Sequence, residues 1–211
     1  MKKILCSIFC IMFVYNCSIH AQETTQSTTL KNEISVSTSK LSFDNLSLKY
    51  ARFISNDLWF KVGFIDLEGS YQKNMPSVGL PQGSSYNSTK STLNGGLLIG
   101  IEKQKSINRL EFTYGLNVQM IYNYSNYTTG DPNVPVIQRD INVYKYIPGI
   151  VSDLAFFYRI NSSFLLGFEI NPSINYAFIN GNSDSGYTYK NRDFYFSFTN
   201  NGALVTLKYR F

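Results

Sequence analysis

The sequence predicts an all-β protein, a transmembrane antiparallel up-and-down β-barrel of eight strands. Three observations predict this fold class. Long segments alternate large apolar residues with small or polar ones, the period of two that gives a strand two different faces. The connections between these segments alternate between tight turns and long polar stretches. After residue 21 there is no run of 18 apolar residues, so strands would have to make any membrane crossing.

The first 21 residues are typical of a secretory signal peptide. Lys2 and Lys3 precede an apolar stretch that ends near Tyr15, and Ala21 offers a small residue at a cleavage site. The apolar stretch is shorter than the roughly 20 residues of a membrane-spanning helix. We therefore expect a cleaved signal peptide over 1–21, a flexible periplasmic lead-in over 22–30 and a transmembrane β-barrel domain over 31–211.

Cleavage would remove every cysteine and the one histidine of the chain, because all four lie within the first 21 residues. We therefore expect no disulfide, no metal site, no cofactor and no catalysis that depends on a thiol or an imidazole. The mature chain would carry 17 Lys and Arg against 14 Asp and Glu, scattered along its length. Nucleic-acid binding needs a concentrated basic patch, so we expect no nucleic-acid partner.

The alternation is clearest in the predicted fifth and seventh strands. In the fifth, Leu116, Val118 and Met120 share one face, and Asn117 and Gln119 share the other. The first strand is weak, since only two apolar residues alternate with Ser and Thr, and without it the even strand count of a barrel fails. The eight strands are expected at 31–41, 46–54, 58–72, 92–104, 109–126, 142–160, 163–180 and 194–211.

The connections differ in length in a regular order. Tight turns are predicted at 55–57, 105–108 and 161–162, and long polar segments at about 73–91, 127–141 and 181–193. Outer-membrane barrels have short periplasmic turns and longer external loops. This order predicts an outer-membrane protein with both termini in the periplasm.

Aromatic residues gather near the strand ends, as the two interfacial girdles of a membrane barrel require. One predicted girdle, at the periplasmic rim, comprises Trp59, Phe112, Phe156, Tyr158, Phe164, Tyr209 and Phe211. The other, at the outer rim, comprises Tyr71, Tyr122, Tyr124, Tyr144, Tyr146, Tyr176 and Phe178.

Two segments resemble a known family. Residues 48–63 read Leu-Lys-Tyr-Ala-Arg-Phe-Ile-Ser-Asn-Asp-Leu-Trp-Phe-Lys-Val-Gly, a strand, a turn and a strand, and residues 203–211 alternate up to a final Phe. The chain resembles the small eight-stranded outer-membrane barrels typified by OmpA, OmpX and OmpW, and especially the outer membrane protein beta-barrel domain group. The resemblance implies the outer membrane of a Gram-negative bacterium and insertion by the barrel-assembly machinery. It marks Val205, Leu207, Tyr209 and Phe211 as the C-terminal insertion signal.

The same resemblance bears on activity. The group has no shared activity, and the enzymes among small outer-membrane barrels rely on a histidine, which this chain would lose with its signal peptide. We therefore expect no enzymatic function.

Charged residues on the polar faces are candidates for a barrel-interior network. They are Glu102, Glu111, Lys145, Asp153, Arg159 and Glu169, with Lys61, Asp66 and Glu68 as further members. An ion-paired plug and a selectivity path for solutes are both compatible with them. We favour the plug, because the interior of an eight-stranded barrel is just wide enough for its own side chains. Buried charges also need partners of opposite sign.

Tyrosines in the predicted external loops are candidates for contact with an unknown surface ligand, because Tyr among Ser, Gly and Asn suits recognition. They are Tyr86, Tyr127, Tyr187 and Tyr189. The alternative is that these rings continue the strands above the membrane.

The expected function is that of a non-enzymatic integral outer-membrane barrel with a structural or surface-interaction role, in contact with outer-membrane lipid. It should be a monomer, because a closed barrel leaves no free sheet edge. One alternative is a narrow porin-like channel or carrier for small or hydrophobic solutes. Another is a soluble lipocalin-like binder, in which Leu116, Val118, Ile170 and Ile174 would face a dry interior.

Overall fold

The computed structural model describes residues 30–39, 46–73, 88–130, 135–136, 139–183, 186, 188–197 and 203–211. The chain divides into the units Met1–Leu30 and Lys31–Phe211, and all the strands lie in the second. The expected signal peptide and nearly all of the lead-in lie outside the described residues, so the cleavage stays a prediction. No helix among the described residues is long and apolar enough to cross a membrane.

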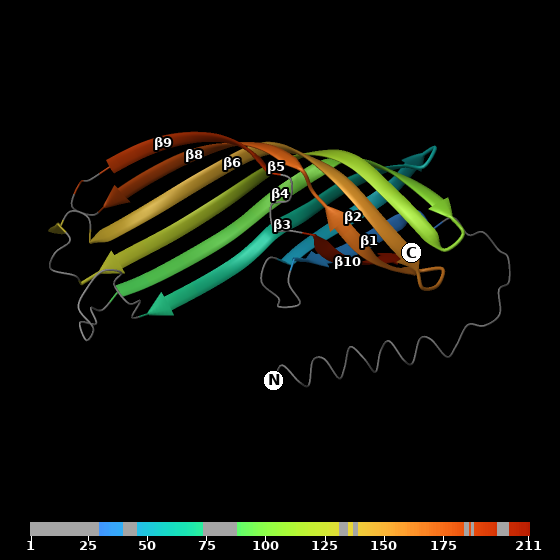
Figure 1. Ribbon diagram of the computed structural model, residues 1–211, viewed down its shortest axis with the longest axis horizontal. Helices are drawn as coiled ribbons and strands as arrows, with labels where there is room; N and C mark the ends of the chain where they lie inside the picture. The colour runs from blue at the N-terminus through green and yellow to red at the C-terminus, as the bar shows by residue number, and fades with distance from the viewer. Residues whose placement is uncertain are drawn as a thin grey trace. The chain divides into compact units, whose positions relative to one another are not determined.

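The described chain forms ten strands, all paired antiparallel in one sheet (Figure 1). They are β1 (Asn32–Thr38), β2 (Leu46–Ser55), β3 (Leu58–Lys73), β4 (Ser88–Ile107), β5 (Leu110–Thr129), β6 (Asp140–Arg159), β7 (Phe164–Ile170), β8 (Ser173–Ser183), β9 (Thr188–Ser197) and β10 (Leu204–Arg210).

Eight of these strands close into a ring. They follow the order β5-β4-β3-β2-β1-β10-β7-β6, and the pairing of β5 with β6 completes the circle. The first predicted strand, whose apolar alternation is weak, does form a strand, because β1 pairs with β10 on one side and with β2 on the other. The predicted all-β class and the eight-stranded ring are confirmed.

The strands are tilted, as closure of a barrel requires. A row of directly opposed residues that starts at Phe164 comes back to the same wall of the ring at Ile174, ten residues further along the chain. Every residue in that row is apolar. It runs through Phe164, Tyr209, Ile34, Tyr50, Val62, Ile99, Val118, Ile150 and Ile174.

Two predicted strands are each divided in two. The seventh breaks at Asn171 and Pro172, and proline has no N–H to donate to a ladder. Because Leu154 opposes Ile170 and Val151 opposes Ser173, β7 and β8 both stay in register with β6. The eighth becomes β9 and β10, with residues 198–202 between them outside the described part.

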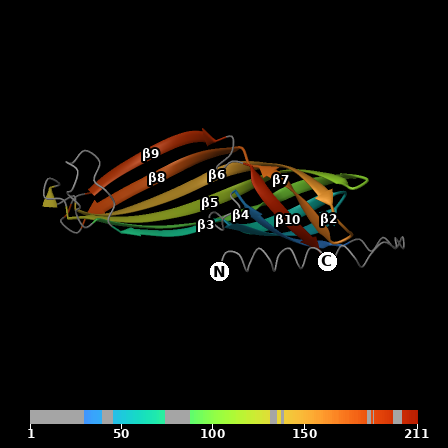
Figure 2. The same cartoon turned by 60° about the horizontal axis from the view of Figure 1, so that its bottom comes forward.

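Beyond the ring, the far parts of β3 to β6 continue together with β8 and β9 as a curved single-layer sheet (Figures 1 and 2). We call this part, made of the far halves of β3 to β6 with β8 and β9, the extension. The end with the turns at Asn56 and Asn108 is the turn end, and the opposite end is the loop end. β1 ends at Thr38 and β2 begins at Leu46, so neither strand reaches far into the extension.

The extension corrects the predicted loop boundaries. The segments 73–91, 127–141 and 181–193 were expected to be loops, yet β4 begins at Ser88, β5 ends at Thr129 and β6 begins at Asp140. The last pairs include Ser88 with Thr129. Thr and Tyr favour strands, and here they continue the ladder where a polar composition had suggested loops.

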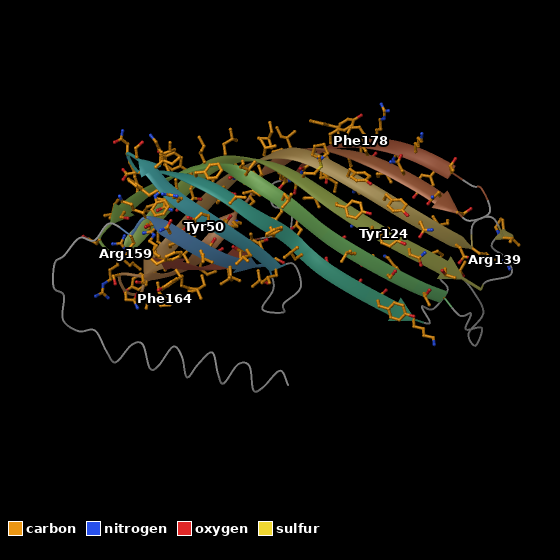
Figure 3. All side chains as sticks on the ribbon, turned by 180° about the vertical axis from the view of Figure 1, so that it is seen from behind. Tyr50, Tyr124, Arg139, Arg159, Phe164 and Phe178 are labelled. Carbon is orange, nitrogen blue, oxygen red and sulfur yellow. The ribbon has the colours of Figure 1, made fainter. Side chains whose placement is uncertain are left out.

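The two faces of the ring differ sharply in polarity. On β5, Leu116 and Val118 are 58% and 59% exposed, whereas Asn117 and Gln119 are buried. Phe168 is 61% exposed beside buried Glu169 on β7. The apolar face therefore points outward, which contradicts the lipocalin-like alternative. Figure 3 shows side chains along the outer surface, including Tyr124 and Phe178 on the extension.

One predicted girdle residue faces the other way. Trp59 is only 5% exposed and lies inside the ring, where its ring packs edge-on against Phe53. It opposes Glu102 on β4, so it shares the inward face of that pair. Its assignment to the periplasmic girdle was wrong, because the chain places Trp59 on the inward parity of β3.

Candidate functional site: a filled barrel interior

Within the described part of the chain, nine charged side chains fill the middle of the ring, and each of these residues is 8% exposed or less. We call them the interior network. Its acids are Glu33, Glu102, Glu111, Asp153 and Glu169, and its bases are Lys49, Lys61, Lys208 and Arg210.

Arg210 binds three strands at the turn end of the network. Its Nε donates to Glu33 at 2.9 Å, its Nη1 donates to Glu111 at 2.8 Å, and its Nη2 donates to Gln104 at 2.6 Å. The guanidinium lies 5.3 Å from the centre of the Trp59 ring, within the range of a cation–π contact. The last strand is thereby tied to β1, β4 and β5.

The three lysines bridge the remaining acids. Lys61 donates to Glu102 at 2.8 Å and also to Asp153. Lys208 pairs with Glu33 at 2.9 Å and lies 3.6 Å from Glu102. Lys49 pairs with Glu169. Buried charges are tolerated when they are paired and hydrogen-bonded in this way.

Uncharged polar side chains add further hydrogen bonds inside the ring. Asn117 donates to Asp153 at 2.7 Å, and Gln119 donates to Asn175 at 2.8 Å. Thr206 links β10 to Glu169 at 3.3 Å. Seven of the nine charges are joined into one bonded group that spans β1, β3, β4, β5, β6 and β10, and Lys49 and Glu169 form a second group with Thr206.

An apolar layer lies beside the network toward the loop end. It consists of Ile65, Leu98, Ile121, Ile147, Val151 and Ala177, all buried, with Ile179 and Tyr195 partly buried against them. These residues point inward, where the alternation predicts polar side chains. At the turn end, Phe157 and Leu165 are also buried inside. Charged, amide and apolar side chains together fill the interior.

Four of the six predicted interior charges lie in the network, and two lie outside it. Glu102, Glu111, Asp153 and Glu169 lie in the network. The Arg159 side chain is 34% exposed at the turn end, 3.6 Å from Glu111 (Figure 3). Lys145 lies outside the network, with its Nζ 5.7 Å from the centre of the Tyr195 ring.

Of the three further members, only Lys61 is part of the network. Asp66 lies at a register shift of β3 with a φ of 53°, and Glu68 accepts a bond from Asn94 in the extension.

The sequence analysis missed Glu33, Lys49, Lys208 and Arg210. The signal was present, because Lys208 and Arg210 alternate with Leu207 and Tyr209 on the last strand. Glu33 precedes Ile34 in the same way, and Lys49 lies between Leu48 and Tyr50. The inward parity of each strand would have identified all four.

The residues of the C-terminal signal face outward on β10 and just beyond it. Tyr209 and Phe211 are exposed and stack at 5.8 Å, while Val205 and Leu207 are partly exposed. The backbone of Phe211 exchanges two hydrogen bonds with Asn32. The end of the chain is therefore part of the seam between the first and last strands.

The candidate contact tyrosines that the structure describes lie in strands. Tyr127 belongs to β5 and opposes Ile141, and Tyr189 belongs to β9, with its ring against Gly181. Tyr86 and Tyr187 lie outside the described residues. Tyr127 and Tyr189 therefore continue the sheet, the alternative to a loop contact.

Comparison with known proteins supports the architecture. No family model and no curated protein matches the chain. A major outer membrane protein of Thermus thermophilus is 12% identical, with a TM-score of 0.52 over 86% of this chain and 98% of that one. Neisserial surface protein A and Acinetobacter baumannii CarO, each 12% identical, give TM-scores of 0.31 and 0.27; they cover 86% and 89% of this chain and 94% and 99% of theirs. The chain has the fold of a small bacterial outer-membrane β-barrel.

Proposed function

We propose that the chain is a non-enzymatic integral protein of the bacterial outer membrane, with a structural or surface-interaction role. In this proposal the turn end and both termini face the periplasm, and the loop end faces outward. The extension and the connections beyond it would then present a surface to the outside. Insertion would use the barrel-assembly machinery and the C-terminal signal.

The outward face supports a place in the membrane. On β5 the outward side chains run from Tyr114 through aliphatic residues to Tyr122 and Tyr124, and then become polar at Asn126. The Tyr124 hydroxyl donates to Asn142 at 2.8 Å, and Asn126 donates to the same residue at 2.9 Å. A band of this kind, aliphatic in the middle and aromatic at its edges, suits hydrocarbon between two interfaces.

The filled interior is the observation that carries the role. Arg210, Lys61 and Lys208 hold acids from several strands across the ring, and the apolar layer covers the network toward the loop end. Such packing leaves the ring rigid and favours a structural role over a channel.

Membrane fractionation with gel migration tests the membrane assignment. A folded barrel should be extracted from the outer membrane with detergent and should change its migration on heating, because the closed sheet resists detergent until it is heated. A soluble periplasmic monomer would contradict the proposal.

Single-channel recording tests the role. In planar bilayers we expect no stepwise conductance from the folded protein, with a known porin as the positive control for the bilayer. Reproducible conductance steps that disappear with heat-denatured protein would support the narrow channel instead.

A further inference from the structure

The extension has two borders that the ring lacks. Among the described residues, β9 pairs with β8 alone, and β3 beyond Leu67 pairs with β4 alone. Figures 1 and 2 show these two strands as opposite borders of the curved sheet. We call the border formed by Arg192–Ser197 of β9 the open edge.

The open edge crosses the boundary of the apolar band. Outward along β9, the side chains change from Phe196 and Phe194, which are 64% and 70% exposed, to the exposed cations Arg192 and Lys190. On the neighbouring β8 the change is from Phe178 to an asparagine. Apolar side chains followed by cations are typical of the depth at which acyl chains meet phosphate groups.

The inner face of the open edge carries one aromatic side chain between two polar ones. Tyr195 points inward between Phe194 and Phe196, and it packs with Ile179 against the apolar layer while staying partly exposed. Asp193 and Ser197 share this face with Tyr195. Tyr195 and Ile179 are therefore the apolar part of the inner face at this border.

The backbone of the open edge sets a second requirement. Unpaired amides and carbonyls are costly in hydrocarbon, where no water can bond them. An acyl chain alone cannot meet this requirement, but the phosphate and ester oxygens of a lipid lie at the boundary where the edge lies, and they can accept hydrogen bonds from the amides. The two cations add an attraction for negative charge, and in the described residues neither forms an ion pair, although Asp193 lies on the inner face between them and Tyr195.

We propose that an anionic membrane lipid docks on the open edge. One acyl chain lies against Tyr195 and Ile179, and the phosphate group faces the side chains of Arg192 and Lys190. The proposal rests on the proposed function, since it needs the band of Phe194 and Phe196 to lie in a membrane.

Quenching by brominated lipids tests the contact, because Trp59 is the single tryptophan of the chain and lies inside the ring. Three proteins are reconstituted in vesicles with brominated acyl chains: the unmodified chain, W59F with F168W, and W59F with Y195W. Heat-modifiable migration confirms that each is folded. We expect weak quenching of Trp59, strong quenching at position 168, and quenching at position 195 comparable to that at 168.

A charge comparison tests the headgroup. In W59F with Y195W, brominated phosphatidylglycerol should quench more than brominated phosphatidylcholine. The added changes K190Q and R192Q should remove that difference. The matched control is K103Q with K105Q, which removes two exposed cations from the outward face of β4 near the turn end and should leave the difference intact.

The outcomes separate this inference from the proposed function. No quenching at position 168 would mean that the protein is not in lipid, and both proposals would fail. Quenching at 168 without quenching at 195 would overturn the lipid site alone. Aqueous acrylamide then separates the two remaining cases. It should quench a tryptophan at position 195 that faces water, and it should not quench one that is covered by polypeptide.

Discussion

Glu33 and Arg210 join the first and last strands of the ring both through the backbone and through their side chains. They are opposed residues in the pairing of β1 with β10, and the Arg210 Nε lies 2.9 Å from a Glu33 carboxylate oxygen. The ring therefore closes on an ion pair inside its wall. Because Arg210 also binds Glu111 of β5, closure of the seam brings together charges from across the interior.

The first prediction concerns this seam. Arg210→Gln should lower the free energy of unfolding in urea, measured in lipid vesicles, by about 3–5 kcal/mol, because Glu33 and Glu111 would each lose a buried cation. Adding Glu111→Gln should recover part of the loss, since it removes one of the unpaired charges.

Arg159→Gln is the control for that change. The Arg159 side chain is 34% exposed and lies 3.6 Å from the same Glu111, so its loss should cost under about 1 kcal/mol. Equal losses from Arg210→Gln and Arg159→Gln would show that burial does not set the strength of these pairs.

The second prediction concerns Gly167 on β7. A Cβ at this position would lie 2.1 Å from the Phe156 carbonyl oxygen and 2.5 Å from the Phe157 ring, so the strands could not keep their spacing. Gly167→Ala should destabilise the barrel by about 1–3 kcal/mol in the same urea assay.

Gly69 on β3 offers the matched control, because a Cβ there meets nothing within 4 Å. We expect Gly69→Ala to be close to neutral. A neutral Gly167→Ala would mean that β6 and β7 are not as close as the structure has them.

The ring could be predicted from the sequence because its strands obey one simple rule. A wall with hydrocarbon on one side and a polar interior on the other imposes a period of two, which is visible from Leu110 to Tyr124 in β5. The turn at Asn56 and Asp57 could also be predicted, since Asn and Asp tolerate the positive φ that a tight hairpin turn requires, and both residues have it in the structure.

The rest could not be predicted because it depends on partners far away in the sequence. The apolar layer forms because Ile65, Leu98 and Ile121 meet inside the ring. In the sequence, each is a single apolar residue at a position where the alternation predicts a polar one. The extension exists because β3 and β9 reach beyond the ends of the strands that would otherwise pair with their borders, and the alternation along a strand does not predict this. Glu33 is different, because its inward parity beside Ile34 was visible in the sequence even though the alternation of that strand is weak.

The third prediction tests the direction of the apolar face. Val118 is 59% exposed in the middle of the band, so Val118→Arg should cost about 2–4 kcal/mol in vesicles, as an arginine near the bilayer midplane does. Thr128→Arg, on the outward face of β5 opposite Asp140, should cost about 0–1 kcal/mol. Equal costs at the two positions would mean that the band does not lie in hydrocarbon.

The fourth prediction separates the insertion signal from stability. Phe211 is 46% exposed, and its side chain stacks on Tyr209, whereas its backbone already pairs with Asn32. Phe211→Ala should therefore keep both backbone bonds and lower the final stability little, but it should slow assembly by the barrel-assembly machinery in reconstituted vesicles. Phe156→Ala is the control, because Phe156 is 40% exposed and packs on Phe112 in the same outward surface. If both variants assemble equally slowly, the ring at position 211 acts as lipid-facing surface and carries no separate signal.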